Sequence, residues 1–119
     1  MLRFRSLGSG SSGNATLVEG SDGLRITRLL VDCGFGLKQL DARLAMAGLD
    51  ADQIDAVFIT HEHGDHIGCA RQLALRNRKM VWMSPGTHAA LDAPDFKGLL
   101  QLAQDGTSID LGGIQIQPF

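Results

Sequence analysis

The sequence predicts an α/β fold with a mixed sheet, and two observations lead to this class. Short apolar runs of strand length alternate along the chain with stretches whose apolar residues recur at helical spacing. Three of the four histidines also fall within residues 61–66, between an apolar run and a helical pattern. Ligands usually bind at such carboxyl ends of strands in α/β sheets, so this stretch is the candidate site.

The composition is close to that of an average globular domain. The length of 119 residues suits one domain, with 44% hydrophobic and 20% charged residues. The net charge of −2 gives no overall attraction to nucleic acid, although a local basic patch could still bind phosphate. No apolar run approaches the roughly 18 residues of a membrane span. No apolar region follows Arg3 and Arg5, so a signal peptide is not expected. Cys33 and Cys69 form neither a C-x-x-C pair nor a disulfide framework, which favours a reduced, cytoplasmic chain without a membrane partner.

Strands and a glycine-rich loop are predicted for the first 32 residues. A first strand covers Met1–Leu7, and the loop Gly8–Asn14 follows it. This loop is either a flexible connector or a segment whose bare backbone N–H groups approach an anion, and it does not match the P-loop pattern. Two further strands, Ala15–Gly20 and Leu24–Asp32, are joined by a predicted turn at residues 21–23. Asp32 ends its strand, where it either bonds local backbone or orients a metal-bound histidine.

Helices and strands alternate in the middle of the chain. Apolar residues at helical spacing predict a helix that begins near Leu37 and ends at Gly48, and a buried strand follows at Ala56–Ile59. A second helix is predicted from Ile67 to about Arg76. Basic residues gather at its end, where they either compensate the helix dipole or contact a phosphate backbone. These residues are Arg71, Arg76, Arg78 and Lys79.

The last third is predicted to contain a strand, a capped helix and a hairpin. Met80–Met83 is a short apolar strand, and Ser84 with Pro85 begins a third helix. That helix carries His88, which is expected to be structural because a lone helical histidine usually is. Residues 92–106 are predicted to be irregular, with a helical turn near residues 99–103. Alternating isoleucine and leucine around Gly112–Gly113 predict a β-hairpin.

The stretch Thr60–Gly68 carries the chemistry. In extended backbone, His61 and His63 project to the same side and can share one metal ion, whereas Asp65 and His66 lie at a neighbouring point and can hold a second. Imidazole and carboxylate groups suit zinc, manganese or iron. In the alternative interpretation, Asp65 caps the next helix and the histidines are ordinary surface residues. Three histidines in six residues at a strand–helix junction favour metal binding.

The sequence Thr60-His61-Glu62-His63-Gly64-Asp65-His66 matches the H-x-H-x-D-H signature of the metallo-β-lactamase fold superfamily. Residues 4–16, which include Gly-Ser-Gly-Ser-Ser-Gly-Asn, and residues 30–34, Leu-Val-Asp-Cys-Gly, resemble the YycJ/WalJ-like branch of this superfamily. Members of that branch are regarded as metal-dependent hydrolases with a suggested DNA exonuclease activity. The resemblance therefore implies a hydrolase of phosphodiester bonds, with nucleic acid as the candidate substrate.

The resemblance also implies a role for each site residue. His61 and His63 would bind a first divalent ion, while Asp65 and His66 would bind a second, most simply zinc, with manganese or iron as alternatives. Asp65 would be the catalytic residue among them. Asp32 would contact and orient the ligands without binding the ion itself. A water held between the ions would attack the scissile centre. The same centre could instead hydrolyse another ester, a thioester or a lactam.

The resemblance covers the N-terminal half of the superfamily fold. It implies that residues 1–119 form a single, partial domain, half of an αββα sandwich whose mixed sheet carries helices on one face. No histidine follows His88, so further metal ligands of the superfamily are missing, and the chain is expected to be truncated. A homodimer could cover the exposed sheet face. The alternative to an enzyme is an inactive metal-binding or self-associating domain.

Overall fold

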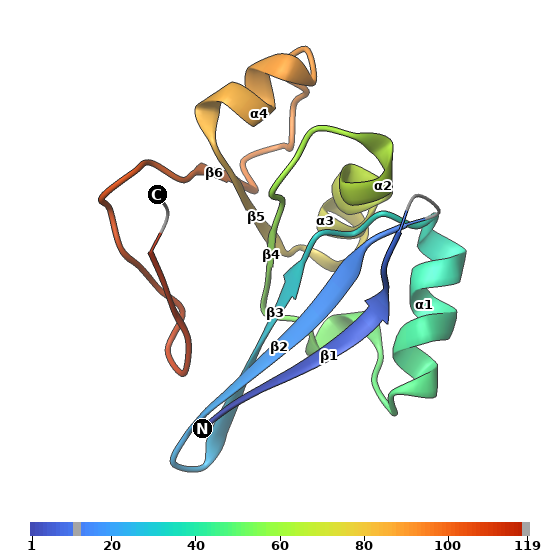
Figure 1. Ribbon diagram of the computed structural model, residues 1–119, viewed down its shortest axis with the longest axis vertical. Coiled ribbons are helices and arrows are strands. Elements are labelled where there is room, and N and C mark those ends of the chain that lie inside the picture. Colours follow the sequence, from blue (N-terminus) through green and yellow to red (C-terminus); the bar gives the residue numbers. More distant parts are fainter. Residues whose placement is uncertain (11–12, 118–119) are drawn as a thin grey trace.

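The computed structural model describes residues 1–10 and 13–117, with the side chain of Asp65 excepted. A six-stranded mixed sheet in the order β1-β2-β3-β4-β5-β6 forms its centre, and a two-stranded hairpin, β7-β8, lies beside it (Figure 1). The strands are β1 (Leu2–Gly8), β2 (Ala15–Asp22), β3 (Arg25–Val31), β4 (Ala56–Phe58), β5 (Met80–Met83), β6 (Leu100–Leu102), β7 (Ile109–Asp110) and β8 (Gln115–Ile116). The helices are α1 (Leu37–Met46), the 3-10 turn η1 (Ala51–Gln53), α2 (Gly64–Ile67), α3 (Ala70–Asn77) and α4 (Pro85–Ala90).

The pairing of the strands sets where the loops meet. The pairs β1/β2 and β2/β3 are antiparallel, whereas the pairs from β3 to β6 are parallel. The parallel strands therefore all point their carboxyl ends at one edge of the sheet, where ligands usually bind. The segments that leave β3, β4 and β5 come together at that edge. The predicted mixed α/β fold is confirmed.

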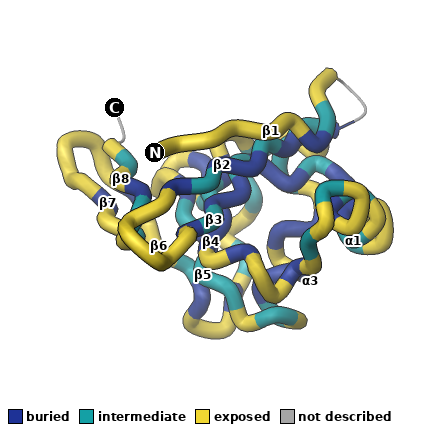
Figure 2. Tube along the Cα trace, turned by 90° about the horizontal axis from the view of Figure 1, so that it is seen from below, coloured by how far each residue is buried: buried dark blue, intermediate teal, exposed yellow. Residues whose placement is uncertain are grey.

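Helices cover one face of the sheet, as predicted. Alternate residues of the strands point into a core that includes Leu40 and Leu44 of α1 and Leu73 of α3. The sheet contributes Leu17, Leu30, Val57 and Val81, each of which is at most 1% exposed. Figure 2 shows this buried interior between the sheet and the helices. No helix within the described ranges is long and apolar enough to span a membrane.

The opposite face of the sheet is partly covered by the chain itself. Ile114, in the loop of the β7–β8 hairpin, is buried in a second apolar cluster with Val18, Leu29 and Ala56. The hairpin comes so close to β2 that a Cβ on Gly20 would lie 2.3 Å from the carbonyl oxygen of Gly113. The expectation of an exposed sheet face is therefore too simple, because this hairpin shields part of it.

The second predicted helix begins at Ala70 and not at Ile67, and a separate short helix, α2, precedes it. A continuous helix was expected from Ile67 to about Arg76, but α2 ends at Ile67 and α3 begins at Ala70. Gly68 adopts a φ of 35° between them, and a Cβ there would lie 2.2 Å from the carbonyl oxygen of Cys33. Glycine is needed for this close backbone approach, and the approach turns the chain between the two helices.

Two local predictions are wrong. The helical turn predicted near residues 99–103 is the strand β6, because Val81 donates its N–H to Leu99 and Ala103 donates to Met83 on the neighbouring strand β5. The turn predicted at residues 21–23 falls at Gly23 and Leu24 instead, since the pairing of β2 with β3 continues to Asp22 and Arg25. The predicted hairpin around Gly112–Gly113 is confirmed, with Ile109 paired to Ile116.

Candidate metal centre

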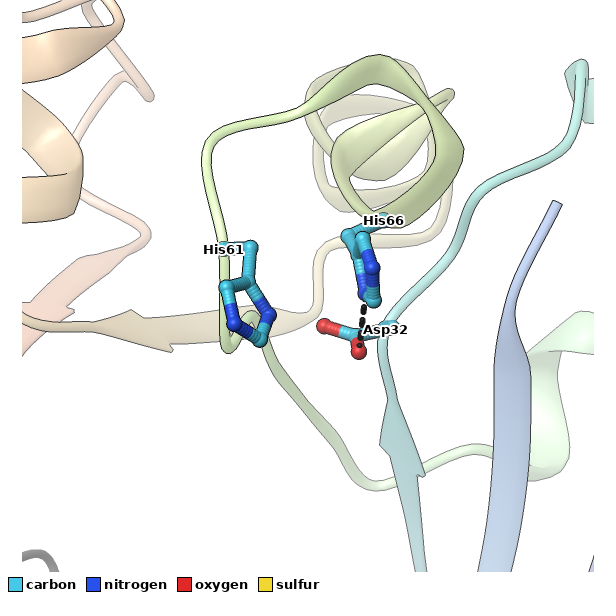
Figure 3. A group of neighbouring side chains, drawn as sticks. All are labelled: Asp32, His61 and His66. Atoms are coloured by element: carbon cyan, nitrogen blue, oxygen red, sulfur yellow. Dashed lines mark hydrogen bonds and ion pairs between the residues drawn. The ribbon is translucent and has the colours of Figure 1, made fainter. Parts of the chain in front are cut away.

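Three side chains from three segments meet at the carboxyl edge of the parallel strands. Asp32 follows β3, His61 follows β4 and His66 lies in α2. One ligand atom from each of the three lies within 4.8 Å of the others (Figure 3). The parallel neighbours β3 and β4 carry Asp32 and His61 to the same edge, and the amide N–H of Asp32 donates to the carbonyl of Phe58 over 2.8 Å.

The backbone at Asp32 turns sharply to place its carboxylate. Asp32 has a φ of 64°, in the left-handed region that aspartate tolerates better than most residues. The residue is only 7% exposed, so its carboxylate needs hydrogen-bond donors. Oδ1 accepts from the backbone N–H of Thr60 over 2.8 Å, and Oδ2 lies 2.7 Å from Nδ1 of His66. A histidine whose Nδ1 contacts a carboxylate in this way binds a metal ion through Nε2.

The loop after β3 fixes the backbone of α2. The amide of Cys33 donates to the carbonyl of His66 over 2.6 Å, and the amide of Cys69 donates to the carbonyl of Cys33 over 3.2 Å. The two buried thiols lie behind this junction with 3.1 Å between their sulfur atoms. Their hydrogen bond, together with burial, raises the pKa of the Cys33 thiol. Both cysteines are buried and pack as small apolar groups.

The other two predicted ligands, His63 and Asp65, are not part of the described cluster of Asp32, His61 and His66. The ring centroid of His61 is 4.6 Å from that of His66 and 6.4 Å from that of His63. The rings of His61 and His63 are stacked, with an interplanar angle of 19°. His63 is exposed and is the N-cap residue of α2, without a side-chain capping bond. Asp65 lies within α2 and is not an N-cap residue, and its side chain is outside the described part of the structure. The predicted split of four ligands between two ions therefore stays a prediction.

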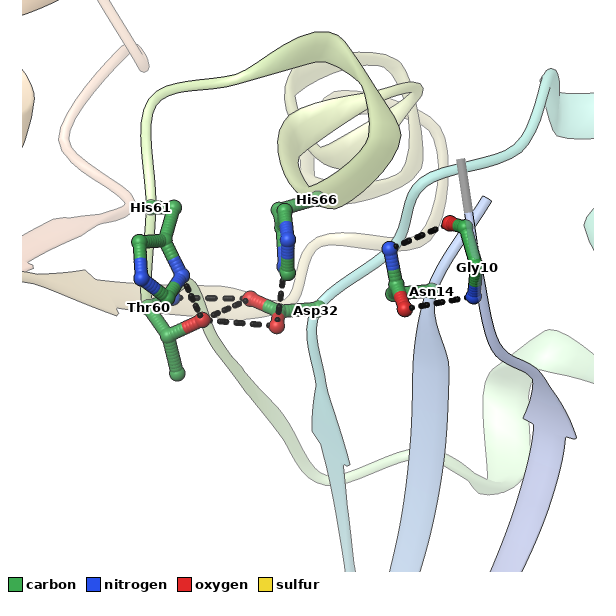
Figure 4. A network of polar contacts seen from close by, with 6 residues as sticks. All are labelled: Gly10, Asn14, Asp32, Thr60, His61 and His66. Atoms are coloured by element: carbon green, nitrogen blue, oxygen red, sulfur yellow. Dashed lines mark hydrogen bonds and ion pairs between the residues drawn. The ribbon is translucent and has the colours of Figure 1, made fainter. Parts of the chain in front are cut away.

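The glycine-rich loop lies next to the centre. The side-chain amide of Asn14 accepts from Gly10 N–H over 3.0 Å and donates to Gly10 O over 2.8 Å. The amide of Gly34 donates to the carbonyl of Asn14 over 2.9 Å, so the loop is joined to the segment that carries Asp32. Figure 4 shows the Gly10–Asn14 pair beside Asp32. The prediction that the loop approaches an anion also involves Ser11 and Ser12, which lie outside the described residues.

Most of the predicted basic patch holds the domain together. Arg71 donates to the carbonyl of Asp95, Arg76 makes two 2.8 Å bonds to Asp41, and Lys79 donates to the carbonyl of Asp52. These bonds to other segments are a role that neither predicted alternative includes, and they count against a phosphate-binding patch. The structural role predicted for His88 is confirmed as well, since its Nε2 lies 2.9 Å from the carbonyl oxygen of Pro94.

Thr60 is a member of the cluster to which sequence reasoning assigned no role. Its hydroxyl lies 2.9 and 2.7 Å from the two carboxylate oxygens of Asp32 and 2.9 Å from Nδ1 of His61. A usable signal was present in the sequence, because a hydroxyl residue stands directly before the first histidine. Its partner Asp32 is 28 positions earlier, and only the pairing of β3 with β4 brings the two together.

The cluster fits a divalent metal ion. Nδ1 of His61 is hydrogen-bonded to Thr60 and Nδ1 of His66 to Asp32, and an imidazole held through Nδ1 in this way binds a metal ion through Nε2. Imidazole nitrogens suit zinc, manganese or iron, and the carboxylate of Asp32 is placed to orient His66.

Comparison with known proteins agrees with this geometry. Residues 8–117 match the model of the metallo-beta-lactamase superfamily, so the chain belongs to that superfamily. It is 31% identical over 123 residues to exodeoxyribonuclease WalJ of Streptococcus pneumoniae, with 99% of this chain and 44% of WalJ covered. It is 35% identical to exodeoxyribonuclease YycJ of Bacillus anthracis over 91 residues, with 76% of this chain and 33% of that protein covered. The chain thus spans less than half the length of these relatives.

A solved structure shows the same fold. The subclass B3 metallo-β-lactamase BJP-1 of Bradyrhizobium japonicum superposes with a TM-score of 0.75 at 15% identity, covering 96% of this chain and 47% of that one. The six-stranded sheet with its helices is therefore the metallo-β-lactamase arrangement, as the sequence predicts. At this identity the likeness concerns the fold alone.

Proposed function

We propose that the protein is a metal-dependent hydrolase that cleaves phosphodiester bonds in nucleic acid. The observation that carries the proposal is the meeting of His61 and His66 with the buried carboxylate of Asp32 at the carboxyl edge of the sheet. The names of WalJ and YycJ, both exodeoxyribonucleases, favour DNA as the substrate. The proposal includes two ions, with His61 and His63 on one, Asp65 and His66 on the other, and zinc as the first candidate metal.

The chain's own residues prepare this centre. Bound divalent ions would polarise the scissile ester and lower the pKa of a water molecule. Asp32 orients His66 by accepting from its Nδ1, and Cys33 fixes the backbone carbonyl of the same histidine. We assign Asp65 the part of the catalytic ligand, because its position in the motif places it one residue before His66 on α2. Rigid support of this kind limits the reorganisation that metal binding requires.

Hydrolysis of another ester, a thioester or a lactam is the second candidate function. The cluster of imidazole and carboxylate groups would serve each of these reactions, and BJP-1 shows that a β-lactamase shares the fold. The nuclease relatives, which are at least 31% identical, favour the phosphodiester instead.

We also propose self-association, through the part of the sheet face that the β7–β8 hairpin leaves uncovered. Phe58 and Trp82 are half-buried on the sheet face that the β7–β8 hairpin only partly covers. A second copy or a further segment of the protein that packs there would bury more of this apolar surface. Sedimentation velocity over a range of concentrations tests the homodimer, which a monomer at every concentration would exclude. The two unbridged cysteines agree with the proposed cytoplasmic location.

The test of function is a substrate panel. The product of the complete reading frame, loaded with zinc or manganese, is incubated with single- and double-stranded DNA, a phosphodiester dye, a thioester and a β-lactam. Release of nucleotides from DNA, lost in His66→Ala, is the expected result. Turnover of the thioester or the lactam alone would contradict the nuclease assignment. Bound metal without any hydrolysis would instead favour an inactive metal-binding domain.

A further inference from the structure

We propose that Thr60 is a positioning residue that sets the tautomer of His61, so that one carboxylate, Asp32, orients both histidines of the cluster. The inference rests on the proposed function only in that it treats His61 and His66 as metal ligands. Its geometric basis is a chain of hydrogen bonds that runs from His61 through the Thr60 hydroxyl to Asp32 and on to His66 (Figure 4).

The Thr60 hydroxyl has a single proton, and this sets which group donates in each hydrogen bond of the series. Thr60 Oγ1 lies 2.7 and 2.9 Å from the two oxygens of Asp32, and an ionised carboxylate can only accept hydrogen bonds. The hydroxyl proton therefore points to Asp32. Oγ1 then presents lone pairs to Nδ1 of His61 at 2.9 Å, so this nitrogen must be the donor. His61 is thereby held as the Nδ1–H tautomer.

The same argument about donors and acceptors applies to His66. Its Nδ1 lies 2.7 Å from Oδ2 of Asp32, so it also carries its proton on Nδ1. Both histidines consequently present the lone pair of Nε2, the form in which a neutral imidazole binds a metal ion. Asp32 acts directly on His66 and through Thr60 on His61.

Because Thr60 is exposed, its hydroxyl can be removed without disturbing the fold. Thr60 is exposed, whereas Asp32 is buried and also accepts from the backbone N–H of residue 60. Valine at this position keeps the shape of the side chain and the backbone donor but loses the hydroxyl. The substitution Thr60→Val should therefore leave the fold and the bond between His66 and Asp32 intact, while His61 loses its partner. Serine keeps the hydroxyl, so Thr60→Ser is the matched conservative variant.

The tautomers of the metal-free chain test the inference. Long-range ¹⁵N–¹H correlation spectra of the imidazoles, recorded at about pH 8 to favour neutral rings, distinguish Nδ1–H from Nε2–H. His88 is an internal reference, because its Nε2 faces the carbonyl of Pro94 and must donate to it. We expect Nδ1–H for His61 and His66 and Nε2–H for His88 in the same spectrum. An Nε2–H tautomer for His61 in the unmodified chain would overturn the inference.

The variants give the second part of the test. In Thr60→Val the Nδ1–H population of His61 should fall relative to Nε2–H by about fivefold, the worth of one ordinary hydrogen bond, with His66 unchanged. Zinc affinity, measured by titration, should fall about tenfold in this variant and be restored in Thr60→Ser. An unchanged His61 tautomer in Thr60→Val, or an equal change at His66, would contradict the role of Thr60. If the unmodified chain binds no metal, the proposed function fails, but the tautomer spectra still decide this inference.

Discussion

The carboxylate of Asp32 lies 2.7 Å from Nδ1 of His66, although 34 positions of sequence separate the two residues. The parallel pairing of β3 with β4 and the close approach of Gly68 to Cys33 create this contact. This contact joins the end of β3 to α2 and holds the candidate metal centre in place.

Replacing Asp32 should weaken metal binding more than it weakens the fold. Asparagine keeps the size of the side chain and tolerates the φ of 64°, but it has one acceptor oxygen where the carboxylate has two. Either His66 or Thr60 then faces an amide NH₂ group. We expect Asp32→Asn to lower zinc affinity by about 10–100-fold in a calorimetric titration. Asp55→Asn is the control, because Asp55 also accepts a backbone N–H but lies outside the cluster. Equal losses in both variants would contradict the assigned role.

Glycine should be required at position 68 but not at position 64. A Cβ on Gly68 would lie 2.2 Å from the Cys33 carbonyl oxygen at a φ of 35°, whereas nothing lies within 4 Å of a Cβ on Gly64. Gly68→Ala should cost about 2–4 kcal/mol of unfolding free energy, as strain and displaced backbone usually do. Gly64→Ala should change it by less than about 1 kcal/mol. Urea unfolding measures both, and similar costs would show that the junction between α2 and α3 is looser than described.

The ion pair between α1 and α3 should make stability depend on acid pH. The two hydrogen bonds from Arg76 hold the pKa of Asp41 below its ordinary value of 3.8. A carboxyl whose pKa is lower in the folded state stabilises the fold above 3.8, and this contribution is lost as the pH falls below that value.

Asp41→Asn removes this pair at every pH. Both side chains are partly exposed, so we expect a loss of only about 0.3–1 kcal/mol near neutral pH, which shrinks below pH 4. Urea unfolding at several pH values measures the difference, with Asp105→Asn at an exposed turn residue as the control. A difference that stays constant down to about pH 2 would contradict the pairing.

Both thiols should resist alkylation in the folded chain. Cys33 is 0% and Cys69 2% exposed, and the hydrogen bond between the thiols together with burial raises the pKa of Cys33. Iodoacetamide should modify them at least about a hundredfold more slowly than in urea, because exposure requires local opening. Mass spectrometry of timed samples measures the rates. Rapid modification of either cysteine without denaturant would show that the segment behind Asp32 opens easily.

The sequence predicted the sheet and the position of the site because both depend on local patterns. The apolar run Ala56–Ile59 followed by closely spaced histidines was enough to place His61 and His66 at a strand end. The break at Gly68 and the strand β6 were missed, because a close backbone contact with Cys33 and a pairing with β5 decide them. The role of Thr60 was missed for the same reason, since its partner Asp32 lies on a neighbouring strand.

Metal titration of the chain and two histidine variants tests the central claim most directly. Zinc binding is measured by calorimetry for the unmodified chain, His61→Ala, His66→Ala and the control His88→Gln, which keeps a donor for the Pro94 carbonyl. The account predicts that the unmodified chain and the control bind zinc alike, and that each alanine variant loses at least about a hundredfold in affinity. Equal zinc affinity in all four proteins, or none in the unmodified chain, would contradict the claim that this cluster is a metal centre.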